Sequence, residues 1–276
     1  MFSQFLILGV GLLGGSVGLA VKRCFPSATV IGVDRCPATL ETAKRLGIVD
    51  RSLMKLDEIP FEKNEPMLAV VCTPVGAIRK NVHRLLNRYG DGRNLLVTDV
   101  GSTKASLCRD IDDLRFIGSH PIAGSQLSGP EAARHDLFQS RPTVLTPTLR
   151  HDRSEVDRLR RFWESLGSIV LEMDADRHDE ILAATSHLPH LLSVALVSTV
   201  TDEQRSLTGA GYADMTRLAA GPPEVWRDIL CDNGENVLSA LRRFQNRLME
   251  IATALETKDI EAVESFLRRG RNATET

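Results

Sequence analysis

Short apolar runs alternate with amphipathic stretches along the first two thirds of the chain. The runs that we predict to be strands are 5–8, 29–33, 67–71, 95–100, 116–117, 143–146 and 168–173. Stretches with helical periodicity lie between several of them, at 17–24, 38–46, 78–89 and 152–166. Strands that alternate with helices predict an α/β fold with a parallel, doubly wound sheet.

The pattern changes after about residue 174. Strand signals end there, and helical periodicity continues through 182–200, 213–220, 226–251 and 260–268. We therefore expect two domains, an α/β domain over residues 1–174 and an all-helical domain over residues 175–276. The run 188–200 is apolar nearly all round, which is typical of a helix buried on several sides. In so small a domain, we expect a second subunit to cover it.

The first predicted strand leads directly into Gly9-Val10-Gly11-Leu12-Leu13-Gly14, and a predicted helix follows. A G-x-G-x-x-G pattern between a strand and a helix indicates a Rossmann, dinucleotide-binding domain. Gly9 would permit the tight turn, Gly11 the approach of a pyrophosphate, and Gly14 close packing of helix on strand. The helix N-terminus, with Leu12 and Leu13, would offer N–H groups to the anion. The alternative is a glycine-rich turn with a purely structural role.

Asp34 ends the second predicted strand, twenty residues after Gly14. A carboxylate at this offset accepts from the ribose hydroxyls of NAD and repels the extra phosphate of NADP. Arg35 follows and could bind that phosphate, which leaves the preference open. The strand 67–71 ends at Cys72-Thr73-Pro74, so Thr73 and Pro74 are further candidates for cofactor binding.

A candidate base lies where the run Phe116-Ile117 breaks off into Gly118-Ser119-His120-Pro121. We expect a strand that opens into a loop here, and ligands bind at such strand ends in open parallel sheets. His120 titrates near neutral pH and could accept a proton, although its position alone equally suits a loop-holding hydrogen bond. The run 95–100 likewise ends at Gly101-Ser102-Thr103-Lys104.

Two signals lie in the helical half. His187 and His190 flank Pro189, and proline kinks a helix. Two histidines three residues apart can chelate a metal, but no acidic residue or cysteine nearby completes a ligand set, so we expect no metal. Arg217 presents a fork that suits a carboxylate, with a surface or interdomain salt bridge as the alternative.

Composition narrows the function classes. The chain has 276 residues, 42% of them hydrophobic and 25% charged, and a formal net charge of -2. This balance argues against nucleic-acid and membrane-surface partners, which favour a basic excess. Five scattered cysteines form no C-x-x-C pair. No apolar run reaches about 18 residues, and no signal peptide is evident at the N-terminus, so we expect a cytoplasmic protein.

Together these pieces resemble the prephenate, arogenate and cyclohexadienyl dehydrogenase family. The matching stretches are Gly9-Val10-Gly11-Leu12-Leu13-Gly14-Gly15-Ser16, Asp99-Val100-Gly101-Ser102-Thr103-Lys104, Gly118-Ser119-His120-Pro121-Ile122-Ala123-Gly124, Ser186-His187-Leu188-Pro189-His190, Asp214-Met215-Thr216-Arg217 and Trp226-Arg227-Asp228. The first motif is shared by many dehydrogenases, whereas the two histidine motifs together are far more specific. The resemblance implies a Rossmann domain followed by an all-α dimerisation domain.

The implied reaction is the NAD-dependent oxidative decarboxylation of prephenate to 4-hydroxyphenylpyruvate on the route to tyrosine. The resemblance implies that His120 accepts a hydrogen bond from the ring 4-hydroxyl. Ser102 would orient that hydroxyl, His120 and the nicotinamide, and Arg217 would hold the ring carboxylate. The implied partners are prephenate and a second copy of the chain.

Three other positions match family residues, and two depart. Ala210 stands where some relatives carry glycine. The resemblance places His190 near the substrate side chain, and Trp226 and Asp214 at positions contributed across the dimer. Gln126 stands where some relatives carry an acidic residue. An acidic residue would attract the ammonium of arogenate, so Gln126 favours prephenate, unless it points to solvent or backbone. A dual or arogenate-specific enzyme is the alternative.

Two rival functions remain. A β-hydroxyacid-type dehydrogenase has a similar two-domain plan but uses a lysine early in its second domain, and no lysine occurs between Lys104 and Lys258. A non-catalytic NAD sensor could keep the fold, but the retention of Ser102, His120 and Arg217 argues against it.

Overall fold

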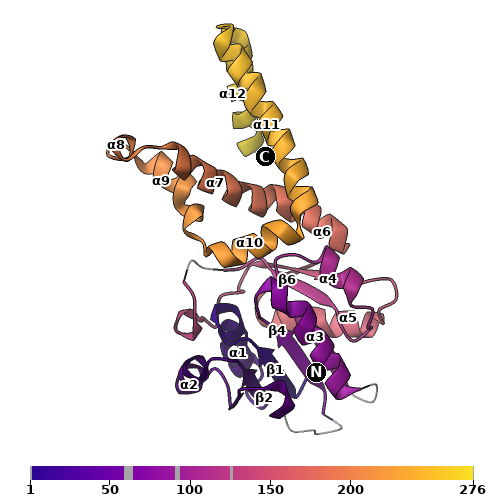
Figure 1. Ribbon diagram of the computed structural model, residues 1–276. Helices are drawn as coiled ribbons and strands as arrows, with labels where there is room; N and C mark the ends of the chain where they lie inside the picture. The colour runs from indigo at the N-terminus through magenta and orange to yellow at the C-terminus, as the bar shows by residue number, and fades with distance from the viewer. Residues whose placement is uncertain (1, 59–64, 91–93, 125–126, 276) are drawn as a thin grey trace. The chain divides into compact units, whose positions relative to one another are not determined.

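The computed structural model describes residues 2–58, 65–90, 94–124 and 127–275 (Figure 1). The chain forms two compact units. The first contains Met1–Ile181 and Ala220–Asp232, and the second contains Leu182–Ala219 and Asn233–Thr276. The domain boundary near residue 174 stays a prediction.

The first unit contains a five-stranded parallel sheet, as the sequence pattern predicts. Its strands are β1 (Gln4–Leu8), β2 (Thr29–Val33), β3 (Arg51–Leu53), β4 (Met67–Val71) and β5 (Leu95–Asp99), in the order β3-β2-β1-β4-β5. The short β3 is an addition to the predicted strands. Every residue of β1, β4 and β5 is buried, because helices cover both faces of the sheet.

Alternate residues of β1 divide the core into two layers. Phe5 and Ile7 pack in the cluster that contains α1 residues, whereas Leu6 and Leu8 pack with α3 residues. Successive side chains of a strand point to opposite faces, so α1 and α3 cover opposite faces, as Figure 1 shows. The helices of this part are α1 (Leu12–Cys24), α2 (Pro37–Arg45), α3 (Val75–Tyr89) and α4 (Ala105–Asp110), with a 3-10 turn at Leu56–Glu58.

A second, three-stranded sheet follows. Its strands β6 (Gly118–Pro121), β7 (Pro142–Thr146) and β8 (Ile169–Glu172) lie in that order, and α5 (Arg153–Ser165) connects β7 to β8. A 3-10 turn, Pro130–Ala132, precedes β7. The strand β6 runs antiparallel to β7, whereas β7 and β8 are parallel, so this part departs from the all-parallel pattern.

The predicted start of the loop at Gly118 is wrong. Gly118–Pro121 is itself the strand β6, and His120 pairs in register with Val144 of β7. A parallel bridge between Val97 and Phe116 leads the chain from β5 toward β6. His120 therefore lies on a rigid strand, and the loop begins only beyond Pro121.

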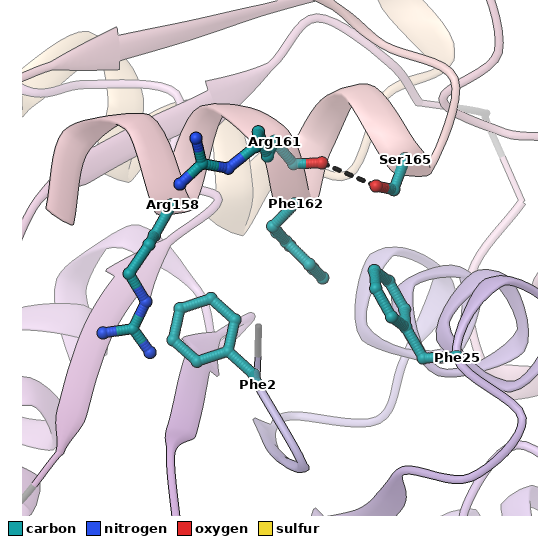
Figure 2. A pocket seen from close by; sticks show the side chains of 6 residues that line it. All are labelled: Phe2, Phe25, Arg158, Arg161, Phe162 and Ser165. Carbon is teal, nitrogen blue, oxygen red and sulfur yellow. Dashed lines mark hydrogen bonds between the residues drawn. The ribbon is translucent and has the colours of Figure 1, made fainter. Parts of the chain in front are cut away.

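Aromatic side chains close the edge of the parallel sheet at the N-terminal ends of the strands. The guanidinium of Arg158 lies 4.4 Å from the ring centroid of Phe2, and the Phe25 and Phe162 rings stack at 6.4 Å. Figure 2 shows these side chains around a cavity of about 80 Å³. Phe2 precedes β1, so this cavity lies at the opposite edge of the sheet from the glycine turn and is too small for a dinucleotide.

The rest of the chain is helical. Its elements are α6 (Ala175–Leu182), a π-helical segment (Ala183–His187), α7 (Leu188–Thr199), α8 (Asp202–Arg205), α9 (Ala210–Thr216), a 3-10 turn (Arg217–Ala220), α10 (Pro223–Asp232), α11 (Gly234–Glu256) and α12 (Ile260–Thr274). The helix predicted over 226–251 is interrupted. It forms two helices, α10 and α11, which separate at the buried Asn233.

The second unit exposes many large apolar side chains. These are Val194, Leu207, Met215, Leu238, Leu248, Met249, Leu255, Ile260 and Leu267. Within α7 only Leu188, His190 and Ser193 are buried. The helical run Ala175–Thr199 is long and apolar enough to cross a membrane by length and composition, with a mean hydropathy of 1.5 and 28% of that window buried. Core helices of soluble proteins pass the same test, so this run assigns no membrane role.

Candidate functional site

Glycines shape the turn between β1 and α1. Gly9 has φ of +87°, and a Cβ at this position would lie 2.8 Å from the carbonyl oxygen of Cys72. A Cβ on Gly14 would lie 2.0 Å from the carbonyl oxygen of Gly9. No described atom lies within 4 Å of a Cβ built on Gly11. The turn is therefore closed to side chains at Gly9 and Gly14 and open at Gly11.

The N-terminus of α1 leaves its amide groups available. Gly11 is the N-cap residue, no side chain among the described residues caps the helix, and its first turn holds no acidic residue. The first hydrogen bond along the helix runs from the N–H of Gly15 to the carbonyl of Gly11, at 2.8 Å. The N–H groups of Leu12, Leu13 and Gly14 thus face the open side of the turn, an arrangement that fits a pyrophosphate.

Asp34 lies directly after β2 beside this turn. Its Oδ2 accepts a hydrogen bond from the N–H of Val10 at 3.0 Å, and its Oδ1 accepts from the N–H of Cys36 at 2.9 Å. A carboxylate has about four lone-pair positions, so both oxygens keep acceptor capacity for the two hydroxyls of a ribose. The turn and Asp34 together fit a dinucleotide.

Thr73 and Pro74 follow β4 at the same edge of the sheet. Pro74 is the N-cap residue of α3, and the Thr73 hydroxyl accepts a hydrogen bond from the amide of Asn81 at 3.2 Å. The backbone of Cys72 and Thr73 faces Gly9, with Thr73 N 3.1 Å from the position of a Cβ on Gly9. These two residues border the glycine turn.

Asp99 connects the segments that carry Ser102 and His120. It is fully buried at the end of β5 and accepts hydrogen bonds from the N–H of Gly101 at 2.8 Å and the N–H of Ser119 at 3.1 Å. The buried ammonium of Lys104 also pairs with this carboxylate. The loop after β5 and the strand β6 are therefore held to each other at the residues next to both candidates.

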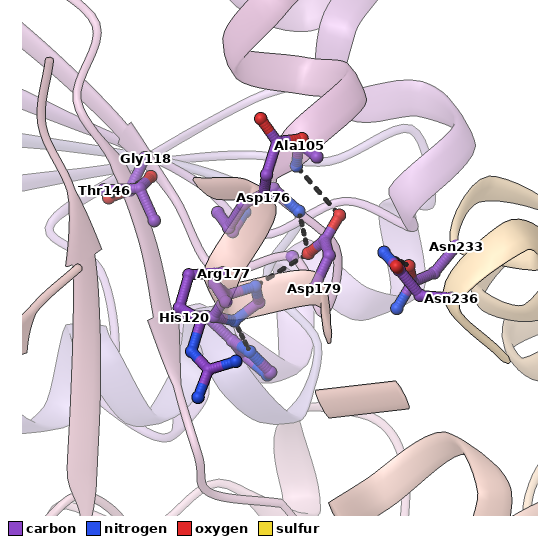
Figure 3. A network of polar contacts seen from close by, with 12 residues as sticks. Ala105, Gly118, His120, Thr146, Asp176, Arg177, Asp179, Asn233 and Asn236 are labelled. Carbon is purple, nitrogen blue, oxygen red and sulfur yellow. Dashed lines mark hydrogen bonds and ion pairs between the residues drawn. The ribbon is translucent and has the colours of Figure 1, made fainter. Parts of the chain in front are cut away.

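His120 belongs to a buried chain of three side chains, which Figure 3 shows around His120 and Asp179. The Nδ1 of His120 lies 2.8 Å from the Nε2 of His178, and the Nδ1 of His178 lies 2.7 Å from the Oδ1 of Asp179. Asp179 also accepts the backbone N–H groups of Lys104 and Ala105, at 2.8 Å and 2.9 Å. His120 is 8% exposed, and His178 is fully buried.

The sequence pattern did not predict this chain of side chains. His178 and Asp179 lie in α6 within a mostly charged run, 174–180, which has the composition of a solvated helix face. Within that run only His178 and Asp179 are buried. No spacing motif indicated them.

The second unit holds three other candidates. His190 is buried in α7, and burial lowers its pKa, while a hydrogen bond to the backbone of Leu218 acts in the opposite direction. Asp214 lies exposed in α9, and Arg217 begins the following 3-10 turn. That turn is held by the N–H of Ala219, which donates to the hydroxyl of Ser193 at 3.0 Å.

The remaining candidates lie elsewhere. Trp226 is half-buried in α10, which belongs to the first unit. Gln126 lies outside the described residues. The first unit contains His120, the segment of Ser102 and the glycine turn, whereas His190, Asp214 and Arg217 lie in the second unit. Among the described residues, no group of three or more His, Cys, Asp or Glu side chains could hold a metal ion.

Comparisons with known proteins agree along the whole chain. Residues 17–172 match the family model of the prephenate dehydrogenase nucleotide-binding domain, and residues 174–269 match that of the prephenate dehydrogenase dimerization domain. The chain is 30% identical to the cyclohexadienyl dehydrogenase of Zymomonas mobilis, over 94% of this chain and 90% of the relative. It is 29% identical to the prephenate dehydrogenase of Bacillus subtilis, over 99% of this chain and 75% of the relative.

A solved structure extends the likeness to three dimensions. The crystal structure of prephenate dehydrogenase from A. aeolicus, in complex with hydroxyphenyl propionate and NAD+, has a TM-score of 0.93 and 30% sequence identity. The match covers 100% of this chain and 98% of that one. The α/β domain with its glycine turn, the helical domain and the two family models thus lead to one assignment: this chain belongs to the prephenate dehydrogenase family of NAD-dependent oxidoreductases.

Proposed function

We propose that this chain oxidises prephenate with NAD and releases 4-hydroxyphenylpyruvate, carbon dioxide and NADH. The observation that carries the proposal is the buried His120, fixed on β6 and tied through Asp99 to the loop of Ser102. A titratable imidazole on a rigid strand, in the same unit as a dinucleotide turn, suits a reaction that removes a proton and a hydride together.

His120 is the residue that we assign to the proton. Its imidazole accepts the hydrogen bond of the ring 4-hydroxyl and takes that proton as the ring carbon loses hydride. Ser102 orients the hydroxyl and the imidazole. NAD would supply the hydride acceptor, and the N–H groups at the start of α1 and the carboxylate of Asp34 would hold it in place.

The second unit contributes the groups that select the substrate. Arg217 binds the ring carboxylate through its guanidinium fork, and His190 lies near the substrate side chain. Trp226, in α10 of the first unit, and Asp214 of the second unit act across a dimer of two copies of this chain, which forms through the helical domain. The exposed apolar side chains of that unit support the dimer, because apolar surface of this kind is buried in obligate interfaces.

Arogenate is the second candidate substrate, because one relative is a cyclohexadienyl dehydrogenase at 30% identity. Arogenate carries an ammonium where prephenate carries a keto group. Gln126 offers an amide donor to the keto oxygen and no charge to the ammonium, and therefore favours prephenate.

We assign the reaction to the cytoplasm.

The test is a direct assay of the purified chain. Prephenate and NAD should give NADH, followed by its absorbance, together with 4-hydroxyphenylpyruvate. The same assay with arogenate measures the ratio of the two kcat/KM values. We expect the ratio to favour prephenate and Gln126→Glu to shift it toward arogenate. Absence of NADH with both substrates would reject the function, and an unmoved ratio in Gln126→Glu would reject the role of Gln126.

A further inference from the structure

A buried pair behind His120 controls which of its two ring nitrogens can act as a base. We infer that His178 and Asp179 are positioning residues that hold the ring proton of His120 on Nδ1 and thereby leave Nε2 as the proton acceptor. This inference rests on the proposed function only in its consequence for the rate. The tautomer itself follows from hydrogen bonds within the first unit.

The carboxylate of Asp179 determines which atom donates in each hydrogen bond between these three side chains. An ionised carboxylate can only accept hydrogen bonds. Burial raises the pKa of Asp179, but the hydrogen bonds from His178 and from the N–H groups of Ala105 and Lys104 outweigh it, and the pKa lies below the ordinary value. Asp179 is thus a carboxylate at neutral pH, held in place by two backbone N–H groups of the α4 N-terminus.

The carboxylate of Asp179 in turn determines which ring nitrogen of His178 carries the proton. In its neutral form the ring carries a single proton. Its Nδ1 lies 2.7 Å from the Oδ1 of Asp179, where an unprotonated nitrogen would place a lone pair against an anionic oxygen. The proton is therefore on Nδ1, and the Nε2 of His178 is left as a hydrogen-bond acceptor.

His120 has to donate to that acceptor. Its Nδ1 lies 2.8 Å from the Nε2 of His178, so the hydrogen of this contact comes from His120. The two rings meet edge to face, with centroids 5.1 Å apart and an interplanar angle of 72°. The single proton of neutral His120 is thereby assigned to Nδ1, and Nε2 carries the lone pair.

This arrangement serves proton abstraction in two ways. It removes the alternative tautomer, in which Nε2 would already be protonated and could not accept the substrate proton. After Nε2 takes that proton, the Nδ1–H of the imidazolium still donates to His178, and the negative charge of Asp179 lies one ring away. In many enzymes a carboxylate orients and stabilises a histidine base. Here the carboxylate of Asp179 acts on His120 through the ring of His178.

The first test reads the tautomer without turnover. Histidine ¹⁵N shifts distinguish a protonated ring nitrogen from an unprotonated one, and His120→Asn identifies the signals of His120. In the full-length enzyme above pH 7, we expect His120 protonated on Nδ1 and His178 protonated on Nδ1. A proton on the Nε2 of His120, or a doubly protonated His178, overturns the inference.

The second test separates positioning from mere packing. His178→Phe keeps a ring but removes both nitrogens, and we expect kcat to fall about 10²-fold or more, with the KM for NAD within about threefold. His178→Gln keeps one acceptor and one donor and should recover part of the loss. His151→Phe is the control, because the ring of His151 also makes hydrogen bonds through both of its nitrogens, in this case to the backbone of Thr148 and of Phe116, outside this chain of side chains.

The outcomes are distinguishable. Wild-type kcat in His178→Phe overturns the inference, as does an equal loss in His178→Phe and His178→Gln with an unchanged His120 tautomer. If His178→Phe does not fold, the ¹⁵N spectrum of the unsubstituted enzyme still decides. If the enzyme does not oxidise prephenate, the proposed function fails, while the tautomer is still measured.

Discussion

Asp34 accepts a hydrogen bond on its Oδ2 from the backbone N–H of Val10, at 3.0 Å. This contact links the carboxylate after β2 to the middle of the glycine turn, and the N–H of Cys36 holds the other oxygen. Asp34 and the glycine turn, which we propose to bind the ribose and the pyrophosphate of NAD, are therefore fixed relative to each other.

A negative charge at this position predicts a preference for NAD. A 2′-phosphate next to Asp34 would bring two like charges together, so kcat/KM should be higher with NAD than with NADP. Asp34→Asn removes the charge with little change of shape, and we expect the NADP/NAD ratio of kcat/KM to rise about tenfold. Asp50→Asn is the control, since Asp50 also accepts a backbone N–H, that of Val30, away from the turn. Equal use of NADP by the unsubstituted enzyme would mean that Arg35 governs the pocket.

Two glycines of the turn should respond differently to alanine. A Cβ on Gly14 would meet the carbonyl oxygen of Gly9 at 2.0 Å, whereas one on Gly11 would meet no described atom within 4 Å. Gly14→Ala should therefore lower the free energy of unfolding by about 1–3 kcal/mol. Gly11→Ala should leave the Tm nearly unchanged but raise the Kd for NAD, because the added methyl occupies the place of the pyrophosphate. Thermal unfolding and NAD titration of both variants measure this, and equal Tm values for the two would contradict it.

The sequence predicted the longer strands of the parallel sheet correctly, because a strand that is buried on both faces needs a continuous run of apolar residues. Continuous apolar runs mark β1, β4 and β5 because helices cover both faces of that sheet. The antiparallel pairing of β6 with β7 was not predictable, since His120 lies in a segment of small and polar residues with no strand periodicity. The break between α10 and α11 at Asn233 was equally hidden, because helical periodicity continues across it.

Some residues of the candidate site could likewise be predicted from the sequence, and others could not. Gly9, Gly14 and Asp34 follow from a local motif, since the turn and the strand end are close in the chain. His178 and Asp179 reach His120 only through the tertiary fold, nearly sixty residues further along. Side chains that meet only through the tertiary fold leave no spacing motif in the sequence that could be recognised.

His120 should control the rate and not the binding of either ligand. In His120→Asn the amide can still donate to the Nε2 of His178, but no base remains. We expect kcat to fall about 10²–10⁴-fold with the KM values for NAD and prephenate largely unchanged. The activity of the unsubstituted enzyme should also fall at acid pH as the base is protonated. Steady-state kinetics measure both effects, with His151→Asn as the control, and full activity of His120→Asn would remove the assignment.

Arg217 should act mainly on substrate binding. Loss of a bidentate partner for a desolvated carboxylate costs about 2–5 kcal/mol, so Arg217→Ala should raise the KM for prephenate far more than it lowers kcat. Arg205→Ala is the matched control, because this exposed arginine of the same unit pairs with Asp202 at 3.6 Å. An unchanged KM for prephenate in Arg217→Ala would mean that Arg217 does not bind the substrate carboxylate and forms a salt bridge instead.

The burial of His190 predicts a pH dependence of stability. Burial lowers the pKa of His190 below the ordinary value of 6.5, so the unfolded chain binds a proton at a pH at which the folded chain does not. The stabilising contribution of this neutral histidine is therefore complete above about pH 7, and it decreases as the pH falls through 6.5 toward the pKa of the folded state. The resulting slope in the free energy of unfolding is at most about 1.4 kcal/mol per pH unit for one proton.

Urea unfolding between about pH 5 and pH 8, at one protein concentration, measures this slope. His190→Gln keeps an amide donor for the backbone of Leu218 but cannot titrate, so its stability should change less steeply with pH than that of the unsubstituted protein. His135→Gln, at an exposed histidine of the first unit, should keep the original slope. Because unfolding of an oligomer depends on protein concentration, only slopes measured at the same concentration are compared. If His190→Gln retains the full slope, the pH dependence arises from other groups, and His190 titrates alike in the folded and unfolded chain.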